Sequence, residues 1–104
     1  MFQDNFGITH IYGQNLLELK DIQNINIIDI REPFEWKICK LPGTLNIPMR
    51  TLLLEQNRLL DKQKTYYILC HTGQRSYYVS DELTKRGFKV INIIGGIASK
   101  DQYN

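Results

Sequence analysis

Short apolar segments rich in β-forming residues alternate with helical segments along this chain, and no other feature of the sequence constrains the fold as strongly. Isoleucine and tyrosine dominate these segments, and such side chains suit a buried, pleated surface. Segments that are apolar on both faces are typical of a sheet that is covered on both sides. The predicted strands are Ile8–Tyr12, Ile25–Ile30, Thr65–Cys70 and Phe88–Ile94.

Helical segments are predicted between these strands. Pro33 suits the first turn of one helix, and Gly87 suits the end of another. Strands that alternate with helices need crossover connections, which give a mainly parallel sheet. The sequence therefore predicts an α/β fold with three layers, α/β/α, around a mainly parallel central sheet. The predicted helices are Gln14–Lys20, Phe34–Cys39, Arg50–Leu60 and Arg75–Arg86.

The chain has 104 residues, enough for one domain with its own core, so we expect a single domain over residues 1–104. Hydrophobic residues make up 42% and charged residues 23%, a balance typical of a soluble globular protein. The net charge is only +2 and the basic residues are scattered, which argues against a nucleic-acid partner. No apolar stretch is long enough to cross a bilayer, and residues 1–15 lack the pattern of a signal peptide. We therefore expect a cytoplasmic protein without a membrane partner.

The chain contains two cysteines, Cys39 and Cys70, and two histidines, His10 and His71. The cysteines do not form a Cys-x-x-Cys pair, so a zinc site is not expected. A cytosolic chain keeps both thiols reduced. We expect neither a metal nor an organic cofactor.

The ends of two predicted strands carry charged and reactive side chains. Asp29, Arg31 and Glu32 lie at the end of one strand, and Cys70 and His71 lie at the end of another. The carboxyl ends of parallel strands meet at one edge of a sheet, where α/β proteins bind their ligands. The sequence therefore predicts a functional site at that edge.

Cys70 is followed by a short polar loop that contains Gly73 and leads into a helix. The backbone N–H groups of such a loop can converge on one point, which the positive end of the helix dipole also faces. Arg75 adds a positive charge there. Each of these groups favours the thiolate of Cys70 and makes it a nucleophile. The alternative is that Cys70 is only a small buried hydrophobe, an interpretation that the loop residues disfavour.

Four segments together resemble the rhodanese-homology domain family, in the family's order and over nearly the whole chain. Each motif alone is weak evidence, and the four in order at the usual spacing are strong evidence. They are Ile28–Glu35 (D-x-R-x-x-x-E/F), Pro42–Pro48 (P-G-A-x-N-I-P), Cys70–Ser76 (C-x-x-G-x-R-S) and Gly87–Val90 with Gly95–Ile97 (G-F-x-x-V…L-x-G-G).

The resemblance implies that Cys70 takes up a sulfane sulfur as a persulfide and passes it to a nucleophilic acceptor. It also implies that the N–H groups of the loop stabilise the outer sulfur of the persulfide. We expect His71 to be an exposed residue that adds to the positive field, and not a general base. The loop residues implied to bind the substrate or persulfide are His71, Thr72, Gly73, Gln74 and Arg75.

Four further residues are expected to support the loop: Asp29, Arg31, Glu32 and Ser76. In one interpretation Asp29 and Glu32 hold the loop or Arg75, and Arg31 helps to set the local field. In the other these residues form strand-end salt bridges and cap the next helix. The two interpretations overlap, so we expect supporting and not catalytic roles. Cys39 is a second thiol that could resolve the persulfide. Nothing among its neighbours activates it, so we interpret it as a helix residue without a part in the reaction.

The chain departs from the family pattern at three places. Lys40 stands where the family usually has histidine, and Ala98 to Asp101 stand where a tryptophan often follows the closing glycines. These two differences concern packing more than chemistry. The loop is also less basic than the most basic loops of the family, so thiosulfate is an open choice as the physiological donor.

We expect a two-step exchange, in which a donor such as thiosulfate or a persulfide loads Cys70 and cyanide or a thiol unloads it. A protein donor or acceptor, and a carrier that works only with its partner, stay open. A non-catalytic interaction module is disfavoured because both Cys70 and Arg75 are present. A phosphatase or arsenate reductase is disfavoured because the related phosphatases place a longer loop between cysteine and arginine.

Overall fold

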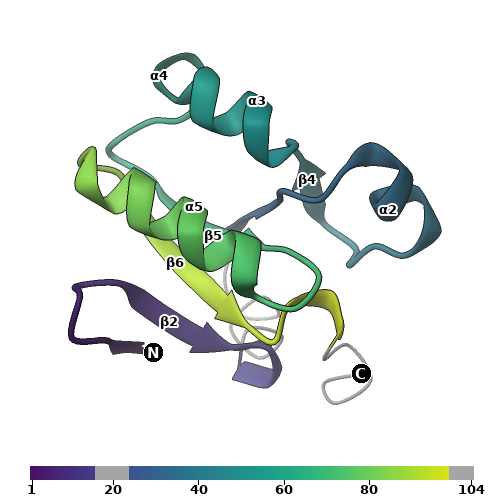
Figure 1. The fold of residues 1–104 in the computed structure, drawn as a ribbon, viewed down its shortest axis with the longest axis horizontal. Helices are drawn as coiled ribbons and strands as arrows, with labels where there is room; N and C mark the ends of the chain where they lie inside the picture. Colours follow the sequence, from purple (N-terminus) through teal and green to yellow (C-terminus); the bar gives the residue numbers. More distant parts are fainter. Residues whose placement is uncertain (16–23, 99–104) are drawn as a thin grey trace.

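The computed structural model describes residues 1–15 and 24–98, and it shows one sheet flanked by helices (Figure 1). Within these residues, six strands form the sheet in the order β1-β2-β6-β5-β3-β4. β1 and β2 are antiparallel, and all the other neighbours are parallel. The strands are β1 Phe2–Gln3, β2 Thr9–Tyr12, β3 Asn26–Asp29, β4 Thr44–Asn46, β5 Thr65–Leu69 and β6 Lys89–Ile94.

The α/β class with a mainly parallel sheet is therefore confirmed, and the four predicted strands lie within one residue of their expected bounds. The predicted helices after β3 and before β6 also agree within one residue. Most of the helix predicted at Gln14–Lys20 lies outside the described residues. The observed helices are α2 Pro33–Ile38, α3 Met49–Leu54, α4 Gln56–Leu59 and α5 Gln74–Lys85.

The single helix predicted at Arg50–Leu60 was wrong, because the chain forms two short helices there. Glu55 has φ −117° and ψ 24°, outside helical geometry, and separates α3 from α4. The side chain of Gln56 donates a hydrogen bond of 2.7 Å to the carbonyl of Leu53. A continuous helix would leave that carbonyl for a backbone N–H four residues on, so the amide side chain replaces a helical bond.

Two short strands were not predicted. β4 has three residues and pairs in parallel with β3, and β1 has two residues and pairs with β2. Both are edge strands too short to show an alternating pattern. Their pairing depends on the neighbouring strand, so the local sequence gave no signal for them.

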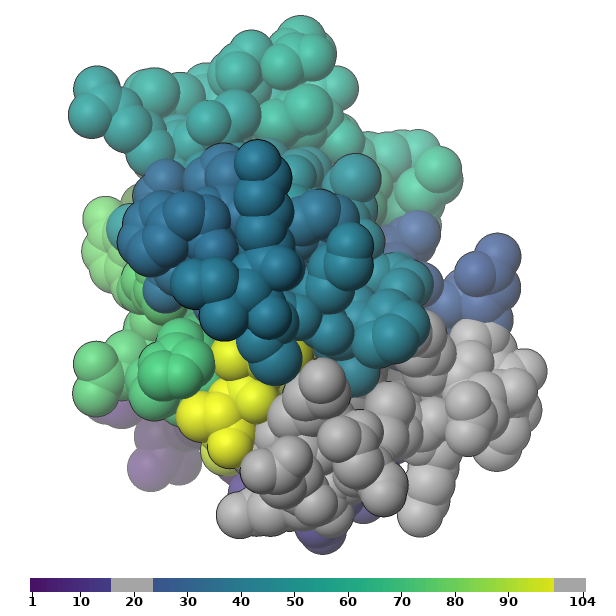
Figure 2. Space-filling model, turned by 90° about the vertical axis from the view of Figure 1, so that its right-hand side faces the viewer, coloured from purple at the N-terminus to yellow at the C-terminus, as the bar shows by residue number. Residues whose placement is uncertain are grey.

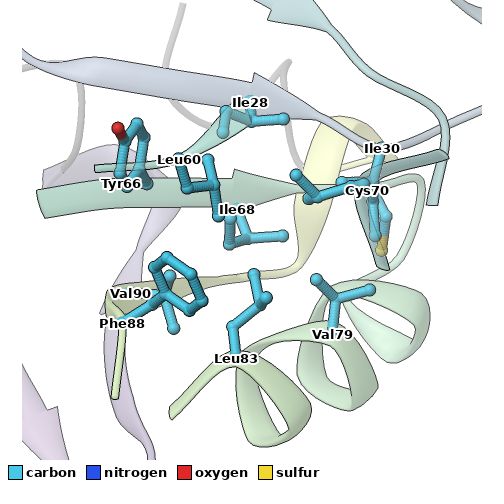
Figure 3. Close-up of a cluster of buried hydrophobic side chains, with 11 residues drawn as sticks. Ile28, Ile30, Leu60, Tyr66, Ile68, Cys70, Val79, Leu83, Phe88 and Val90 are labelled. Carbon is cyan, nitrogen blue, oxygen red and sulfur yellow. The ribbon is translucent and has the colours of Figure 1, made fainter. Parts of the chain in front are cut away.

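The core lies on both faces of the sheet because successive strand residues point to opposite sides. One cluster packs between the sheet and the helices α3 and α5, as Figure 3 shows for Ile68, Val79 and Leu83. The opposite face carries a second cluster that includes Ile27, Tyr67 and Ile91. Both faces of β5 are thus buried, which matches its apolar sequence.

The carboxyl ends of the parallel strands form one edge of the molecule. Figure 2 faces this edge, where α2 in dark blue lies beside the segment after β6 in yellow and the beginning of α5 in green.

Among residues 1–15 and 24–98, no helix is long and apolar enough to cross a membrane.

Candidate active site

Cys70 directly follows β5, the strand that pairs with β3 on one side and with β6 on the other. Its side chain is almost fully buried, with 1% exposed. Figure 3 shows the side chain beyond the end of β5, with the sulfur on the side of α5. The central strand thus delivers the thiol to the predicted edge of the sheet.

Two backbone N–H groups donate hydrogen bonds to the sulfur of Cys70. The distance to Sγ is 3.0 Å from the nitrogen of Gly73 and 3.3 Å from that of Ser76. The first N–H groups of a helix have no partner inside the helix, so the sulfur satisfies donors that the start of α5 leaves open. These donors and the positive end of the helix dipole favour the thiolate over the thiol.

Of the loop amides named from the sequence, that of Gly73 contacts the sulfur, and Ser76 supplies the second donor. Gly73 has φ 102° and precedes the first residue of α5. This left-handed conformation suits glycine and is strained for other residues. The glycine of the motif thus lets the loop turn sharply enough to aim both N–H groups at Cys70.

The segment after β6 closes the loop from behind. The backbone N–H groups of Ile97 and Ala98 donate to the carbonyls of Cys70 and His71, both at 2.8 Å. A Cβ atom on Gly96 would overlap these two carbonyls. The second glycine of the closing pair is therefore needed because the two backbone segments approach too closely for any side chain.

Arg75 is held by Glu35, a residue of α2 that sequence reasoning did not select. Two parallel hydrogen bonds of 2.9 and 3.0 Å join the guanidinium to the carboxylate. They lower the pKa of Glu35 from its ordinary 4.5 to about 2 and raise the pKa of Arg75. The negative charge of Cys70 also raises the pKa of Arg75, to a smaller extent. The guanidinium therefore adds positive charge near the sulfur.

Asp29 and Arg31 form a buried ion pair at the end of β3. Arg31 donates to both carboxylate oxygens of Asp29 at 2.8 to 3.1 Å, and both side chains are at most 3% exposed. Arg31 also donates to the carbonyls of Glu35 and Cys39 at the end of α2. Glu32 precedes α2, and its N–H donates to the carboxylate of Glu35 at 2.8 Å.

The direct contacts of these residues are those of the structural interpretation, while the charges of Asp29 and Arg31 also act on Arg75 and Glu35. Asp29 and Arg31 form a strand-end salt bridge, and Glu32 stands at the N-terminus of the next helix. Arg75 donates its two hydrogen bonds to the carboxylate of Glu35. The signal for Glu35 was present, since it stands at the last position of the D-x-R-x-x-x-E/F segment.

Two cavities adjoin the loop. One of about 270 Å³ is lined by His71 together with residues of α2 and its flanks, Arg31, Glu35, Ile38 and Cys39. The other, of about 580 Å³, lies on the opposite side of the loop and includes Thr72 and Gln74 in its lining. The side chains of His71, Thr72 and Gln74 are exposed, as expected for His71. Among the described residues, no group of three or more His, Cys, Asp or Glu could hold a metal.

Lys40, which replaces the usual histidine, lies over the ring of Trp36 with its ammonium 4.1 Å from the ring centre. Such a contact is a cation–π interaction. The indole N–H of Trp36 donates to Thr44 at 3.3 Å. This departure from the family pattern is therefore absorbed in packing around α2, away from the sulfur.

The fold and the cysteine loop define a class of protein, and comparison with known proteins gives it a name. The rhodanese-like domain matches residues 13–100. The chain belongs to the rhodanese-like domain family. The rhodanese-related protein of Thermoplasma volcanium, whose crystal structure is known, superimposes with a TM-score of 0.79 at 30% identity, covering 92% of this chain and 95% of that one.

Two relatives from Bacillus subtilis have names that concern sulfur. YtwF, named as a sulfurtransferase, is 35% identical over 75 residues, which cover 72% of each chain. YrkF, named as a sulfur carrier protein, is 36% identical over 76 residues, which cover 72% of this chain. The chain spans only 40% of the length of YrkF.

Proposed function

We propose that this protein is a sulfurtransferase that carries a sulfane sulfur as a persulfide of Cys70. The observation that carries the proposal is the pair of N–H groups, from Gly73 and Ser76, that converge on the sulfur at the N-terminus of α5. Such a cradle favours a thiolate, which is the form that attacks sulfur. The names of YtwF and YrkF point to the same chemistry.

The proposed reaction has two steps, each a displacement at sulfur. The Cys70 thiolate attacks the sulfane sulfur of a donor such as thiosulfate, the donor's S–S bond breaks, and sulfite leaves with the electron pair. Cyanide or a thiolate then attacks the outer sulfur of the persulfide. The bond between the two persulfide sulfurs breaks, and Cys70 leaves as a thiolate that the same N–H groups receive.

Arg75 assists both steps because donor and persulfide are anionic. Its side chain is 35% exposed, so the charge is accessible to a donor. The ion pair with Glu35 holds the guanidinium in one position. Arginine fixed in this two-point manner provides a positioned charge. We infer that Arg75 attracts the donor and stabilises the charge on the outer sulfur.

A protein as donor or acceptor is the second candidate. Phe34 and Ile38, one turn apart on α2, are 67% and 82% exposed, and Glu35 between them holds Arg75. Large exposed apolar side chains beside a reactive group favour contact with a macromolecule. A sulfur carrier protein would fit this arrangement, and thiosulfate and cyanide would then be substitutes for the natural partners.

Steady-state kinetics with thiosulfate and cyanide test the proposal. A persulfide intermediate predicts parallel lines in double-reciprocal plots, because sulfite leaves before the acceptor binds. Cys70→Ser is expected to have no activity above background. Intersecting lines with an active wild type would overturn the two-step reaction, and activity retained in Cys70→Ser would overturn the role of Cys70.

A further inference from the structure

A chain of polar side chains leads from Cys70 into the protein and plays no part in the reaction described so far. Ser76 Oγ lies 3.4 Å from Cys70 Sγ and 2.5 Å from Oδ1 of Asn92 on β6. Ser76 is fully buried and Asn92 is 3% exposed. A buried asparagine in the middle of an apolar strand is costly unless it is hydrogen-bonded, so its partners define its role.

The chain continues to a second titratable group. Asn92 Nδ2 lies 3.1 Å from Nδ1 of His10, which is 5% exposed on β2. His10 Nε2 lies 2.8 Å from Oδ2 of Asp4. Five side chains from four parts of the fold thus form one continuous path between the sulfur and a carboxylate.

Asp4 is held as an anion at the end of this path. It accepts hydrogen bonds from His10, from the N–H groups of Phe6 and Ile8, and from the hydroxyl of Tyr77. The hydrogen bond with His10 is the main cause that keeps the pKa of Asp4 far below its usual range. The carboxylate of Asp4 is therefore ionised in the folded protein near neutral pH.

One arrangement of hydrogens suits a neutral Cys70. The thiol donates to Ser76 Oγ, the hydroxyl of Ser76 donates to Asn92 Oδ1, and the amide of Asn92 donates to Nδ1 of His10. His10 is then neutral and donates from Nε2 to Asp4. Each hydrogen bond of the path has one donor and one acceptor in this arrangement.

A thiolate is stabilised by the opposite arrangement. It can only accept, so the hydroxyl of Ser76 turns toward Sγ and away from its two other acceptors, Asn92 Oδ1 and the carbonyl of Gly73 at 3.2 Å. Ser76 Oγ then accepts from Asn92. The amide of Asn92 meets this need by turning over, which points its carbonyl oxygen at Nδ1 of His10. That nitrogen must now carry a proton, and since Nε2 keeps its proton toward Asp4, the ring is an imidazolium.

We propose that Ser76, Asn92 and His10 are positioning residues that couple the charge of Cys70 to that of His10, so that an imidazolium at His10 stabilises the thiolate at Cys70. The proposal rests on Cys70 being the nucleophile of the proposed function. No proton travels along the chain. Cys70 releases its proton to water, and His10 takes one from water through the cavity of about 580 Å³ that His10, Asn92 and Gly73 line.

Among the described residues that contact the His10 ring, Asp4 is the charged one. The ring stacks between Phe2 of β1 and Tyr77 of α5, with ring centres 5.1 and 5.5 Å away. Tyr77 is titratable, but its hydrogen bond to Asp4, together with Asp81 on the same helix, raises its pKa, so it stays neutral. Asp4 contacts His10 directly. The thiolate of Cys70 is a second anion, which acts on His10 through Asn92 and Ser76.

Alkylation of Cys70 by iodoacetamide, followed as a rate against pH, tests the coupling without any sulfur donor. His10→Gln retains a donor and an acceptor but cannot become charged. At pH 6 we expect the variant to react about fivefold more slowly than the wild type, at the lower end of couplings between sites. Above pH 8, where a histidine is mostly neutral, the two rates should converge. Lys89→Gln removes a positive charge from the exposed first residue of β6, far along the strand from the loop, and should keep the wild-type difference between pH 6 and pH 8.

Two results would overturn the proposal. Equal rates of wild type and His10→Gln at pH 6 would show that there is no coupling. An equal slowing at both pH values would show that His10 is only structural. Because alkylation needs no sulfur transfer, an enzyme that fails to transfer sulfur leaves this test intact.

A second measurement covers the case that His10→Gln does not fold. Coupling between two sites is reciprocal, so the thiolate must also favour the imidazolium. The NMR titration of the His10 ring should therefore have a higher midpoint in the wild type than in Cys70→Ser. Coincident midpoints would contradict the proposal.

Discussion

Glu35 of α2 and Arg75 of α5 face each other in a two-point ion pair, with N–O distances of 2.9 and 3.0 Å. The same carboxylate accepts the N–H of Glu32, at the start of α2. The pair therefore joins the helix after β3 to the helix that begins at the cysteine loop. The position of the guanidinium beside Cys70 therefore depends on Glu35 as well as on Arg75 itself.

Glu35→Gln should destabilise the protein by about 1.5 kcal/mol at pH 7, because a neutral amide cannot form the ion pair. The loss is not larger because the pair is partly exposed and solvent weakens it. The free energy of unfolding, measured by urea denaturation, checks this. Glu82→Gln is the matched change at an exposed pair with Arg86, where the N–O distance is 3.5 Å, and should cost less than about 0.5 kcal/mol. Equal costs would show that the pair of Glu35 is no stronger than a surface contact.

The contribution of Glu35 should also depend on pH in one direction. Its pKa is lowered from 4.5 to about 2 on folding, so the unfolded state binds the proton first as the pH falls. The stabilisation is complete above about pH 4.5 and is lost as the pH falls through about 2. The difference in unfolding free energy between wild type and Glu35→Gln should be constant from pH 7 to 5 and shrink below that. A difference that grows on acidification would contradict the ion pair.

Arg75→Ala should make Cys70 less reactive near neutral pH. Loss of a neighbouring positive charge disfavours the thiolate, so the rate of alkylation at pH 7 should fall in the variant. Arg86→Ala removes an arginine from the other end of the same helix, at its C-cap, and should leave the profile unchanged. A profile that is the same in Arg75→Ala and wild type would remove Arg75 from thiolate stabilisation.

Gly96→Ala should disturb the cysteine loop, because the new Cβ would overlap the carbonyls of Cys70 and His71. We expect a loss of at least about 2 kcal/mol in stability and a changed alkylation profile, since the loop must move to admit the methyl group. Gly87→Ala also introduces a side chain at positive φ, where among the described residues its Cβ would meet the flexible side chain of Lys62 at 3.7 Å. That variant should lose about 1 kcal/mol through backbone strain and keep the wild-type profile of Cys70. A normal profile in a folded Gly96→Ala would contradict the close approach.

The central part of the fold could be predicted because its strands are rich in isoleucine and tyrosine, which favour a buried strand. β3, β5 and β6 are buried on both faces, so their composition carries the signal without any partner. The break at Glu55 could not be predicted, since it depends on the Gln56 side chain reaching the carbonyl of Leu53. That bond replaces a helical one and is not encoded in the periodicity.

The candidate site was predicted where it consists of neighbours in sequence. Cys70, Gly73 and Ser76 lie within seven residues, on the loop and the first turn of α5, so their contacts follow from the motif. The contacts of Glu35 with Arg75 and of His10 with Asn92 join distant segments and needed the structure. Asn92 gave a signal that could have been used, because it is a polar residue in the middle of an apolar strand.

The intact mass of the protein after exposure to thiosulfate tests the central claim most directly. The wild type should gain the mass of one sulfur atom and lose it again on addition of cyanide. The variants Cys70→Ser and Cys39→Ser show which of the two cysteines carries the sulfur. The account predicts that Cys39→Ser behaves as the wild type and that Cys70→Ser gains nothing. A gain of sulfur that persists in Cys70→Ser and disappears in Cys39→Ser would contradict it.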